Sequence, residues 1–435
     1  MSTPARAILI AAASSHSGKT LLTAGLIAAL KRRGLAVRAA KAGPDYIDPR
    51  FLEAASAAPA VNLDAFAMGP ERLATLAARQ AEGADLLVVE GVMGLYDGGA
   101  EGLGATAALA RALGLPVLLV VAADGMSQSV AAVAEGFSRL AEGFPLIGAL
   151  VNRVGSERHA GLIREGFERT QVPLLGLIPR QKDLALPSRH LGLVQAEEQR
   201  GLLEAISRAG ELMERHTALD AIFKAAAPVA GPASPAPGLP PPAQRIAVAN
   251  DIAFRFAYPH LLEGWRADGT EISFFSPLAG EGPPQGVGAV FLPGGYPELY
   301  ADRLAAATSF RQGLRRAAER GTLVYGECGG FMALGEALID AQGVSHEMAG
   351  LLPLVTSFQH PKLHLGYRRL APLVDLPFAG PLAAHEFHYA SIVVEGAAER
   401  LFGVRDASGA DLGEAGLRRG SVVGSFLHVI DPLGG

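Results

Sequence analysis

The chain has 435 residues, of which 49% are hydrophobic and 19% charged, and its formal net charge is -5. This length exceeds what one hydrophobic core usually organises, so we expect two domains. The small negative charge, without a long basic block, argues against a nucleic-acid-binding protein. The longest apolar runs, such as LPVLLVVAA, are shorter than the roughly 18 residues of a membrane helix. Because the N-terminus also lacks a signal-peptide pattern, we expect a cytoplasmic protein without a membrane segment.

Between residues 6 and 180, short runs rich in Val, Ile and Leu alternate with segments of helical periodicity. Continuous apolar runs are typical of strands that are buried on both faces, as in a parallel sheet covered by helices. The predicted strands are RAILIAA, LAVRAAK, DLLVVEG, LPVLLVVAA, PLIGALVN and VPLLGLIP. Residues 1–224, which end in a predicted helical segment, therefore form an α/β domain with a doubly wound parallel sheet. Ligands of such sheets bind at the carboxyl ends of the strands.

The residues after the first predicted strand form a candidate phosphate-binding loop. The segment ASSHSGKT matches the pattern G-x-x-x-x-G-K-[ST], except that Ala13 replaces the first glycine. Gly18 allows the backbone to approach a phosphate, Lys19 can reach the β and γ phosphates, and Thr20 can hold Mg²⁺. Ser17 is expected to contribute mainly its backbone amide. The strand, loop and helix context favours an ATP site over an ordinary turn.

Acidic side chains follow two further predicted strands. Asp45 and Asp48 lie in KAGPDYIDP, which also contains Lys41. Glu90 and Asp97 lie in EGVMGLYDG, after the next strand. Carboxylates that face a phosphate loop across a parallel sheet are suited to hold Mg²⁺, directly or through water. Any one of these acids alone could be a solvated loop residue or a helix cap, but their grouping favours a metal site.

Two later segments add candidate ligand-binding side chains. Asn152 follows the strand PLIGALVN, where an amide can meet the edge of an adenine ring. The segment RQKDLALPSRHLGL, near the end of the last predicted strand, supplies Arg180, Lys182, Arg189 and His190. These basic side chains could bind substrate carboxylates; the alternative interpretation is a solvated basic turn.

A change of composition separates the two halves of the chain. Residues 225–244, AAAPVAGPASPAPGLPPPAQ, are almost all Ala, Pro and Gly, and this composition predicts a semi-rigid linker. The pattern of apolar runs then restarts with RIAVAND, TEISFFS, GAVFLPGG and TLVYGECGG. Residues 245–435 are therefore predicted to form a second α/β domain, whose last part, from about residue 363, consists of shorter strands.

The chain has one cysteine, Cys328, in the sequence GECGG between a predicted strand and a predicted helix. This is the context of a nucleophile elbow, in which a tight turn exposes the side chain and a helix N-terminus lowers the pKa of the thiol. A thiol nucleophile needs an imidazole nearby. Spacing alone does not choose among the histidines of this half, although the histidine in GSFLHVID ends a strand-like run. The candidate histidines are His346, His360, His364, His385, His388 and His428. The Gly-Gly turn of FLPGGYPE could supply amides to an oxyanion.

Together these motifs resemble the cobyrinic acid a,c-diamide synthases, a family that includes the hydrogenobyrinic acid a,c-diamide synthases. The resemblance covers nearly the whole chain and rests on SGKT, KAGPDYIDP, EGVMGLYDG, LPSRHLGL, LPGGYPE, YGECGGFM, HEFHY and SFLH, in the order of the family. It implies an N-terminal domain similar to dethiobiotin synthetase and a C-terminal class I glutamine amidotransferase domain.

The resemblance also implies an activity and a role for particular residues. The activity is the ATP-dependent amidation of the a and c acetate groups of a corrin-type ring, with Mg²⁺ as cofactor and L-glutamine as nitrogen donor. The implied ATP-binding residues are Ser17, Gly18, Lys19, Thr20, Lys41 and Asn152; the metal site comprises Thr20, Asp45 and Glu90; the substrate site comprises Asp48, Asp97, Arg189 and His190. In the second domain Cys328 is the implied nucleophile, His428 its base, and Gly295 and Gly329 the oxyanion hole.

One position departs from the amidotransferase pattern. The acid of the catalytic triad normally lies two residues after the histidine, but that position is Ile430, and the nearest acid is Asp431. Either Asp431 or a backbone carbonyl could orient the imidazole. The alternatives for the whole chain are a nickel-sirohydrochlorin a,c-diamide synthase, a cobyric acid synthase, or a P-loop regulatory ATPase with a degenerate amidotransferase domain. The motifs favour the a,c enzyme over cobyric acid synthase, but they separate cobalt-containing from metal-free rings poorly. The oligomeric state stays open, with a homodimer among the options.

Overall fold

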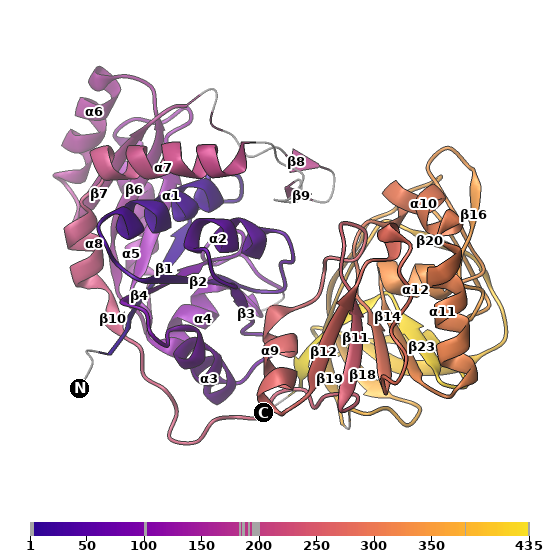
Figure 1. Cartoon of the computed structure of the whole chain (residues 1–435). Helices are drawn as coiled ribbons and strands as arrows, with labels where there is room; N and C mark the ends of the chain where they lie inside the picture. The colour runs from indigo at the N-terminus through magenta and orange to yellow at the C-terminus, as the bar shows by residue number, and fades with distance from the viewer. Residues whose placement is uncertain are drawn as a thin grey trace. The chain divides into compact units, whose positions relative to one another are not determined.

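The computed structural model describes residues 4–99, 102–181, 184, 188–189, 192–193, 201–378 and 380–433. The chain forms two compact units, Met1–Ala236 and Pro237–Gly435 (Figure 1). The division between the units falls inside the expected linker of residues 225–244. No described helix combines the length and the apolar character that a membrane crossing requires.

The first unit is built on an eight-stranded sheet. Its strands are β1 (Arg6–Ala12), β2 (Val37–Ala42), β3 (Val61–Leu63), β4 (Leu86–Glu90), β5 (Val117–Ala122), β6 (Leu146–Val154), β7 (Leu174–Pro179) and β10 (Ala227–Pro228). Seven of them are parallel in the order β3-β2-β4-β1-β5-β6-β7, and β10 pairs antiparallel with β1. All six predicted strands are present. The sequence pattern does not predict β3, because three residues are too few to show a period.

Helices connect these parallel strands, and further helices follow the last of them. The connecting helices are α1 (Lys19–Arg32), α2 (Asp48–Ser56), α3 (Pro70–Gln80), α4 (Thr106–Leu113), α5 (Ser129–Arg139) and α6 (Glu157–Phe167); α7 (Leu202–His216) and α8 (Leu219–Ala225) come after β7. Helix α1 packs against α2 and α7, while α3 contacts α4 and α5 contacts α6 (Figure 1). Helix α1 approaches α7 closely at Gly25, where a side-chain carbon would lie 2.8 Å from the carbonyl oxygen of Ala209. The predicted doubly wound α/β domain is thus confirmed.

The first part of the Pro- and Ala-rich segment packs on the first unit, and its last part packs on the second unit. Its first residues form β10, which pairs with Arg6 and Ala7 of β1. The backbone amide of Ala236 donates a hydrogen bond to Thr75 Oγ1 at 3.0 Å. In the second unit, Trp265 Nε1 donates to the carbonyl oxygen of Leu239 at 3.1 Å. Both ends of the segment are therefore held by the unit to which they belong.

The second unit contains a ten-stranded sheet in the order β12-β11-β13-β14-β23-β22-β21-β18-β19-β24. Its strands are β11 (Arg245–Ala249), β12 (Glu271–Phe275), β13 (Ala289–Leu292), β14 (Leu323–Glu327), β18 (His364–Pro372), β19 (Leu382–His388), β21 (Glu399–Asp406), β22 (Asp411–Arg419), β23 (Val422–Ser425) and β24 (Leu427–Pro432). The first five strands in the order are parallel, and the other pairs are antiparallel. The shorter strands predicted after residue 363 are thus present.

Helices and a second sheet complete this unit. The helices are α9 (Pro259–Ala267), α10 (Ala301–Ala306), α11 (Thr308–Glu319) and α12 (Gly329–Leu334). The four-stranded sheet has the order β16 (Ser345–Glu347), β15 (Ala337–Ile339), β17 (Leu354–Ser357) and β20 (Ser391–Glu395). A core of Phe, Leu, Val and Ala side chains fills the space around β13, β14, α11 and α12, and Cys328 belongs to it.

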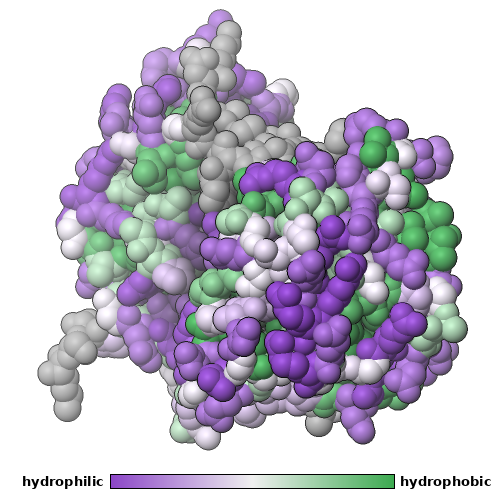
Figure 2. All heavy atoms as spheres, turned by 45° about the vertical axis from the view of Figure 1, so that its right-hand side comes forward, coloured by the Kyte–Doolittle hydropathy of each residue, from purple (hydrophilic) through white to green (hydrophobic). Residues whose placement is uncertain are grey.

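The surface mixes polar and apolar side chains. On the face shown in Figure 2, hydrophilic residues cover much of the surface and hydrophobic residues emerge in separate patches. Three consecutive residues of β20, Ile392, Val393 and Val394, are 44%, 56% and 50% exposed. Successive side chains of a strand point to opposite faces, so β20, at the edge of its sheet, exposes apolar side chains on both of its faces.

Candidate active sites

The phosphate loop joins the end of β1 to the start of α1. Gly18 has a φ of 84°, a left-handed conformation that glycine adopts without strain. A side-chain carbon at this position would lie 2.5 Å from Asn152 Nδ2. The first turn of α1 has no side-chain cap and no acidic residue, so its backbone amides and the positive end of the helix dipole are suited to an anion.

Asn152 braces this loop from the end of β6. Its Nδ2 donates a hydrogen bond to the carbonyl oxygen of Ser17 at 2.9 Å, and its Oδ1 accepts one from the amide of Arg153 at 2.8 Å. The structure therefore places the Asn152 amide against the loop backbone, and its expected contact with an adenine edge stays a prediction. The Ser17 hydroxyl is also bound within the loop, because it donates to the carbonyl oxygen of Ser14 at 2.7 Å.

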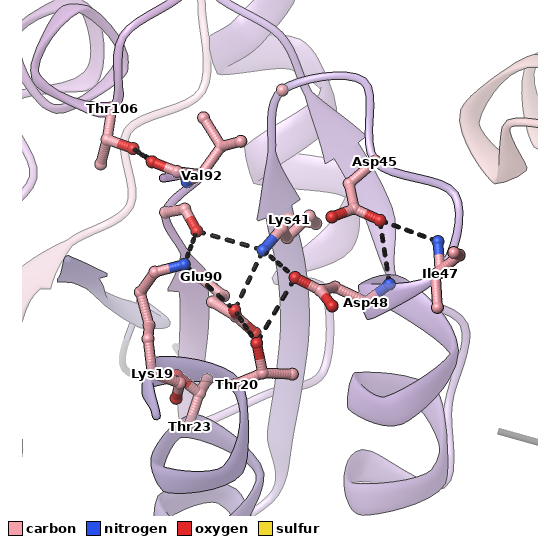
Figure 3. A network of polar contacts seen from close by, with 12 residues as sticks. Lys19, Thr20, Thr23, Lys41, Asp45, Ile47, Asp48, Glu90, Val92 and Thr106 are labelled. Carbon is pink, nitrogen blue, oxygen red and sulfur yellow. Dashed lines mark hydrogen bonds and ion pairs between the residues drawn. The ribbon is translucent and has the colours of Figure 1, made fainter. Parts of the chain in front are cut away.

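A buried network of lysines and carboxylates lies beside the loop (Figure 3). Lys41 and Glu90 are register partners on the adjacent strands β2 and β4, which explains their contact. Lys41 Nζ lies 3.0 Å from Glu90 Oε1 and 2.5 Å from Asp48 Oδ2. Lys19 Nζ lies 3.3 Å from the same Glu90 oxygen, and Thr20 Oγ1 donates to it at 2.7 Å. Five residues from three predicted motifs, SGKT, KAGPDYIDP and EGVMGLYDG, thus meet in one network.

Burial and mutual charge set the protonation of this network. Burial lowers the pKa of Lys19, and the charge of Lys41 lowers it further. Burial would also lower the pKa of Lys41, but the charges of Asp48 and Glu90 outweigh it and raise that pKa above its ordinary value. The two lysines hold the pKa of Asp48 below its ordinary value against the effect of burial. The network therefore contains a permanent lysine cation between two carboxylates.

The oxygen atoms in this network fit a magnesium ion. Glu90 Oε2 is buried, and it has no hydrogen-bond partner among the described residues. Thr20 Oγ1 lies 3.4 Å from Asp48 Oδ2, so hydroxyl and carboxylate oxygens converge beside the loop. Hydroxyl, carboxylate and water oxygens are the ligands that Mg²⁺ prefers.

Asp45 lies at the margin of this oxygen cluster. Its Oδ1 accepts hydrogen bonds from the amides of Ile47 and Asp48 at 2.8 and 3.0 Å. Burial and the negative charge of Asp48 raise the pKa of Asp45 to about 7. Asp48 therefore contacts Thr20, while Asp45 holds the start of α2.

The other predicted ligand-binding residues lie apart from this cluster or outside the described part of the chain. Asp97 is exposed, and its Oδ2 accepts a hydrogen bond from the amide of Gly94 at 3.0 Å, which closes the turn after β4. Arg189 lies in the short strand β8 (Ser188–Arg189), which pairs with β9 (Gly192–Leu193), and only its backbone is described. Lys182 and His190 lie outside the described residues.

A charged group at the ends of β5, β6 and β7 contains Arg180, which the sequence analysis names, and Asp124 and Arg153, which it misses. Asp124 carboxylate oxygens lie 2.5 Å from the guanidinium groups of Arg153 and Arg180. The hydrogen bond from Arg153 lowers the pKa of Asp124. Arg153 also donates to the carbonyl oxygen of His16 at 2.5 Å, so this ion pair holds the phosphate loop from its exposed side. The residue types alone gave no signal, because single charged residues after strands are common.

The second site centres on Cys328, between β14 and α12. Its φ of 48° is unusual for a residue with a side chain and is the strained turn expected of a nucleophile elbow. Cys328 is buried, with 3% of its surface exposed. Its amide donates a hydrogen bond to the carbonyl oxygen of Ser425 at 2.8 Å, which ties the elbow to the end of β23.

The structure brings His428 to this cysteine. A side-chain carbon on Gly294 would lie 3.0 Å from His428 Nε2 and 3.2 Å from Cys328 Cβ, so both side chains flank the same glycine. A side-chain carbon on Gly329 would lie 3.0 Å from the amide nitrogen of Gly295. The backbones of the two predicted oxyanion glycines are therefore adjacent.

The expected lowering of the thiol pKa is wrong. Burial, and after it the negative charge of Glu298, raise the pKa of Cys328 above its ordinary value. Helix α12 has only six residues, and its dipole is too small to offset the burial. Burial, together with the charges of His385 and His388, lowers the pKa of His428 well below its ordinary value. The resting pair is thus a thiol beside a neutral imidazole, which can accept the thiol proton.

A carboxylate that the sequence analysis misses lies beside His428. Glu327 Oε2 is 3.8 Å from His428 Nδ1, and both side chains are buried. Tyr325 and the amide of Val429 donate hydrogen bonds to Glu327 Oε1 at 2.5 and 3.0 Å. Glu327 directly precedes Cys328 in GECGG, so the motif that contains the nucleophile also contains this acid.

The HEFHY motif forms β19 and lies against the cysteine. Cys328 Sγ is 3.8 Å from the carbonyl oxygen of Phe387. On either side of Phe387, His388 Nε2 contacts Glu386 Oε1 at 3.1 Å, and Arg368 Nη2 contacts Glu386 Oε2 at 2.7 Å. Ligand atoms of His364, Glu386 and His388 lie within 4.8 Å of one another. The two imidazole rings are stacked at 4° and 4.7 Å, so their in-plane lone pairs do not converge on one metal ion.

Comparisons with known proteins follow this division into two sites. Residues 8–194 match the family model of the CobQ/CobB/MinD/ParA nucleotide binding domain. Residues 245–431 match that of the CobB/CobQ-like glutamine amidotransferase domain. Fold and sites therefore define a class of protein in which a P-loop nucleotide-binding domain is joined to a glutamine amidotransferase domain.

Relatives that span the whole chain identify the family. The chain is 55% identical to the hydrogenobyrinate a,c-diamide synthase of Brucella anthropi, over 99% of both chains. It is 53% identical to that of a Sinorhizobium species, over 98% of this chain and 99% of the relative. It is 50% identical to that of Rhodobacter capsulatus, over 99% of this chain and all of the relative. The chain belongs to the hydrogenobyrinate a,c-diamide synthase family.

Proposed function

We propose that this chain catalyses the ATP- and glutamine-dependent amidation of the a and c acetate carboxylates of hydrogenobyrinic acid or cobyrinic acid. One observation carries the proposal: a single chain of this family holds a phosphate loop with a lysine and carboxylate network in one unit and a Cys328–His428 pair in the other. Residues 1–224 are assigned the synthetase reaction, and residues 245–435 the release of ammonia from glutamine.

The first unit has to activate a carboxylate. Ammonia does not react with a carboxylate in water, because hydroxide is a poor leaving group. Transfer of the γ-phosphoryl group of ATP to a carboxylate oxygen replaces that leaving group with phosphate. Lys19 and the first-turn amides of α1 would stabilise the charge on the transferred group. Bound Mg²⁺, held by Thr20, Asp45 and Glu90, would neutralise the phosphate oxygens; Asp48 lies 3.4 Å from Thr20 and could join them.

The substrate site is proposed at the same edge of the sheet. The resemblance assigns it to Asp48, Asp97, Arg189 and His190. The position of Asp48, beside Lys41 and Thr20 at the phosphate loop, supports its part in this assignment. Two outcomes distinguish the ring substrates: the enzyme converts hydrogenobyrinic acid, or it converts only the cobalt-containing ring.

The second unit would release ammonia through a thioester. Cys328 Sγ attacks the side-chain amide carbon of glutamine while its proton passes to His428 Nε2. The amides of Gly295 and Gly329 stabilise the oxyanion that forms. His428 then gives the proton to the leaving nitrogen, the C–N bond breaks, and ammonia departs. Water hydrolyses the thioester to glutamate and restores the thiol. The ammonia replaces phosphate on the activated carboxylate of the ring.

Two variants test this division of labour. Cys328→Ala is expected to abolish amidation with glutamine but to retain amidation with a high concentration of ammonium salt, because activation takes place in the other unit. Lys19→Ala is expected to abolish both reactions. The products are counted by mass spectrometry, and two amidations of the ring and no more support the a,c assignment. A folded Cys328→Ala protein that also lost the ammonia-dependent reaction would contradict the two-site scheme.

A further inference from the structure

Glu327 links the nucleophile to the strand that carries the base. It is the last residue of β14, and Cys328 follows it directly. Its Oε1 accepts hydrogen bonds from the Tyr325 hydroxyl at 2.5 Å and from the Val429 amide at 3.0 Å. Val429 is the residue after His428 on β24. One carboxylate oxygen thus holds the backbone next to the base, and the other is directed toward the imidazole.

We infer that Glu327 is the positioning residue of the glutaminase site, which stabilises the imidazolium of His428 that forms when Nε2 takes the thiol proton. The inference rests on the proposed function of Cys328 and His428. Its geometric basis is the distance of 3.8 Å between Glu327 Oε2 and His428 Nδ1, both within the buried core of the second unit.

The distance between Glu327 Oε2 and His428 Nδ1 determines how the two side chains interact in the resting site. At 3.8 Å the two atoms are too far apart for a hydrogen bond, so the contact is electrostatic. In a buried site with little water, an attraction between opposite charges at this distance is stronger than at the surface. The attraction appears only once His428 is charged, so it stabilises the reacting state and not the resting enzyme. Hydrogen bonds of catalytic groups commonly shorten in the complex with substrate.

Glu327 supplies an acid to a site in which the usual position of the triad acid, two residues after the histidine, is occupied by Ile430. In the amidotransferase pattern the acid follows the histidine on the same strand; here it precedes the cysteine on β14. The competing candidates are Asp431 on β24 and the backbone of Phe256, whose hydrogen bond to His428 raises the pKa of the imidazole against the effect of burial. Val429 and Asp431 face the successive residues Ala384 and Ala383, so Ile430 is an extra residue in the strand. Such a bulge turns Asp431 to the same face of the strand as His428. The experiment therefore compares the two acids directly.

Several titratable groups surround this pair, and they enter any interpretation of a pH profile. They are Tyr325 and Cys328 near Glu327, His385 and His388 near His428, and Glu298 and Glu386 near the thiol. Burial raises the pKa of Glu327 to about 8, although the hydrogen bonds from Tyr325 and Val429 oppose this effect. The active carboxylate is therefore expected to form as the pH rises toward that value.

The test uses the full chain with Glu327→Gln and, as the matched control, Asp431→Asn. Both changes replace a buried carboxylate by an amide of the same shape. Glu327→Gln is expected to lower kcat for glutamine hydrolysis about a hundredfold or more, as when the acid of a triad is neutralised. KM for glutamine and amidation with ammonium salt are expected to stay unchanged. Asp431→Asn is expected to alter kcat by less than about threefold. The opposite ranking of the two variants would overturn the inference.

A second variant keeps the inference testable if Glu327→Gln does not fold, which thermal unfolding of the full chain will show. Tyr325→Phe removes one donor to the Glu327 carboxylate and leaves the carboxylate in place. Loss of this hydrogen bond disfavours the ionised form, so the rise of kcat for glutamine with pH is expected to move to higher pH. A purely structural role of Glu327 would leave the pH profile where it is in the wild type.

The outcomes also separate this inference from the proposed function. If the wild type does not hydrolyse glutamine with ATP and a ring substrate present, the proposed function fails. If the wild type hydrolyses glutamine and folded Glu327→Gln does so equally fast, only the role of Glu327 is wrong. An unmoved pH profile in Tyr325→Phe would likewise overturn that role.

Discussion

The amide of Asn152 at the end of β6 donates a hydrogen bond of 2.9 Å to the carbonyl oxygen of Ser17 in the phosphate loop. The same Nδ2 faces Gly18, which has no side chain to obstruct it. The loop conformation therefore depends on a strand that lies two places from β1 in the sheet. A loop that is held in its binding conformation before the ligand arrives does not lose conformational entropy on binding.

Replacing Asn152 by Ala is expected to weaken ATP binding. The Ser17 carbonyl loses its donor, and the loop gains freedom that binding must then remove. A loss of about 1.4 kcal/mol, typical of one hydrogen bond, raises KM for ATP about tenfold. KM is measured in the ammonia-dependent amidation, and glutamine hydrolysis serves as the control for the other unit. An unchanged KM for ATP would show that the loop holds its shape without Asn152.

Replacing Lys41 by Met is expected to destabilise the first unit. Lys41 is 1% exposed and lies between the carboxylates of Asp48 and Glu90, so its removal leaves these two acids with Lys19 alone, which contacts Glu90 at 3.3 Å. Breaking such a buried network costs about 3–5 kcal/mol of unfolding free energy. Added Mg²⁺ is expected to restore part of the loss, because it supplies a cation to the same oxygens. Denaturant unfolding with and without MgCl₂ measures both effects.

The matched control for that variant is Lys31→Met in α1. Lys31 Nζ donates to the carbonyl oxygen of Ser56 at 2.6 Å and contacts no carboxylate in the ion pairs of the described residues. Its loss is expected to cost about 1 kcal/mol, with no response to Mg²⁺. Equal losses in the two variants would contradict the interpretation of Lys41 as the central cation.

Replacing Gly330 by Ala is expected to damage the nucleophile elbow. A side-chain carbon at this position would overlap the carbonyl oxygen of Leu292 in β13, so α12 has to move. Such overpacking costs about 1–3 kcal/mol and displaces Cys328. The matched control is Gly264→Ala in α9, where a side-chain carbon meets nothing within 4 Å. That change is expected to add about 0.5–1 kcal/mol of stability. Thermal unfolding and glutamine hydrolysis of both variants check the contrast.

Glu386 is expected to give the second unit a stability that disappears in acid. Burial opposes ionisation of Glu386, but the hydrogen bond from His388 and the charge of Arg368 lower its pKa from 4.5 to about 2. Because the pKa of the folded state is depressed, the contribution is fully present above pH 4.5 and is lost as the pH falls toward 2. Glu386→Gln is expected to lose about 2 kcal/mol at pH 7 and to flatten this acid dependence. Unfolding free energies between pH 2 and 7 measure it.

The control for that variant is Glu395→Gln, which breaks an exposed ion pair between Glu395 and Arg400. An exposed pair contributes less than about 1 kcal/mol, so little change is expected at any pH. A similar loss in both variants would mean that the ion pairs around HEFHY do not differ from a surface pair.

The α/β alternation, the phosphate loop before Lys19 and the elbow at Cys328 could be predicted from the sequence. Each of these features depends on a few consecutive residues, whose apolar pattern or glycines fix the local backbone. The strand β3 was not predicted, and the expected lowering of the thiol pKa was wrong. The reasons differ. A strand of three residues carries too little pattern, and the thiol environment depends on how deeply the core buries the elbow.

By itself the sequence determined which residue types stand at the ends of which strands, and with them the two kinds of chemistry that this protein combines. Only the tertiary structure decided the partners: Lys41 with Glu90 across 49 residues, Asn152 with Ser17 across 135, and Glu327 with His428. The reason is that such contacts depend on the order of strands in a sheet and on burial, which arise from packing of the whole chain and leave no trace in local spacing.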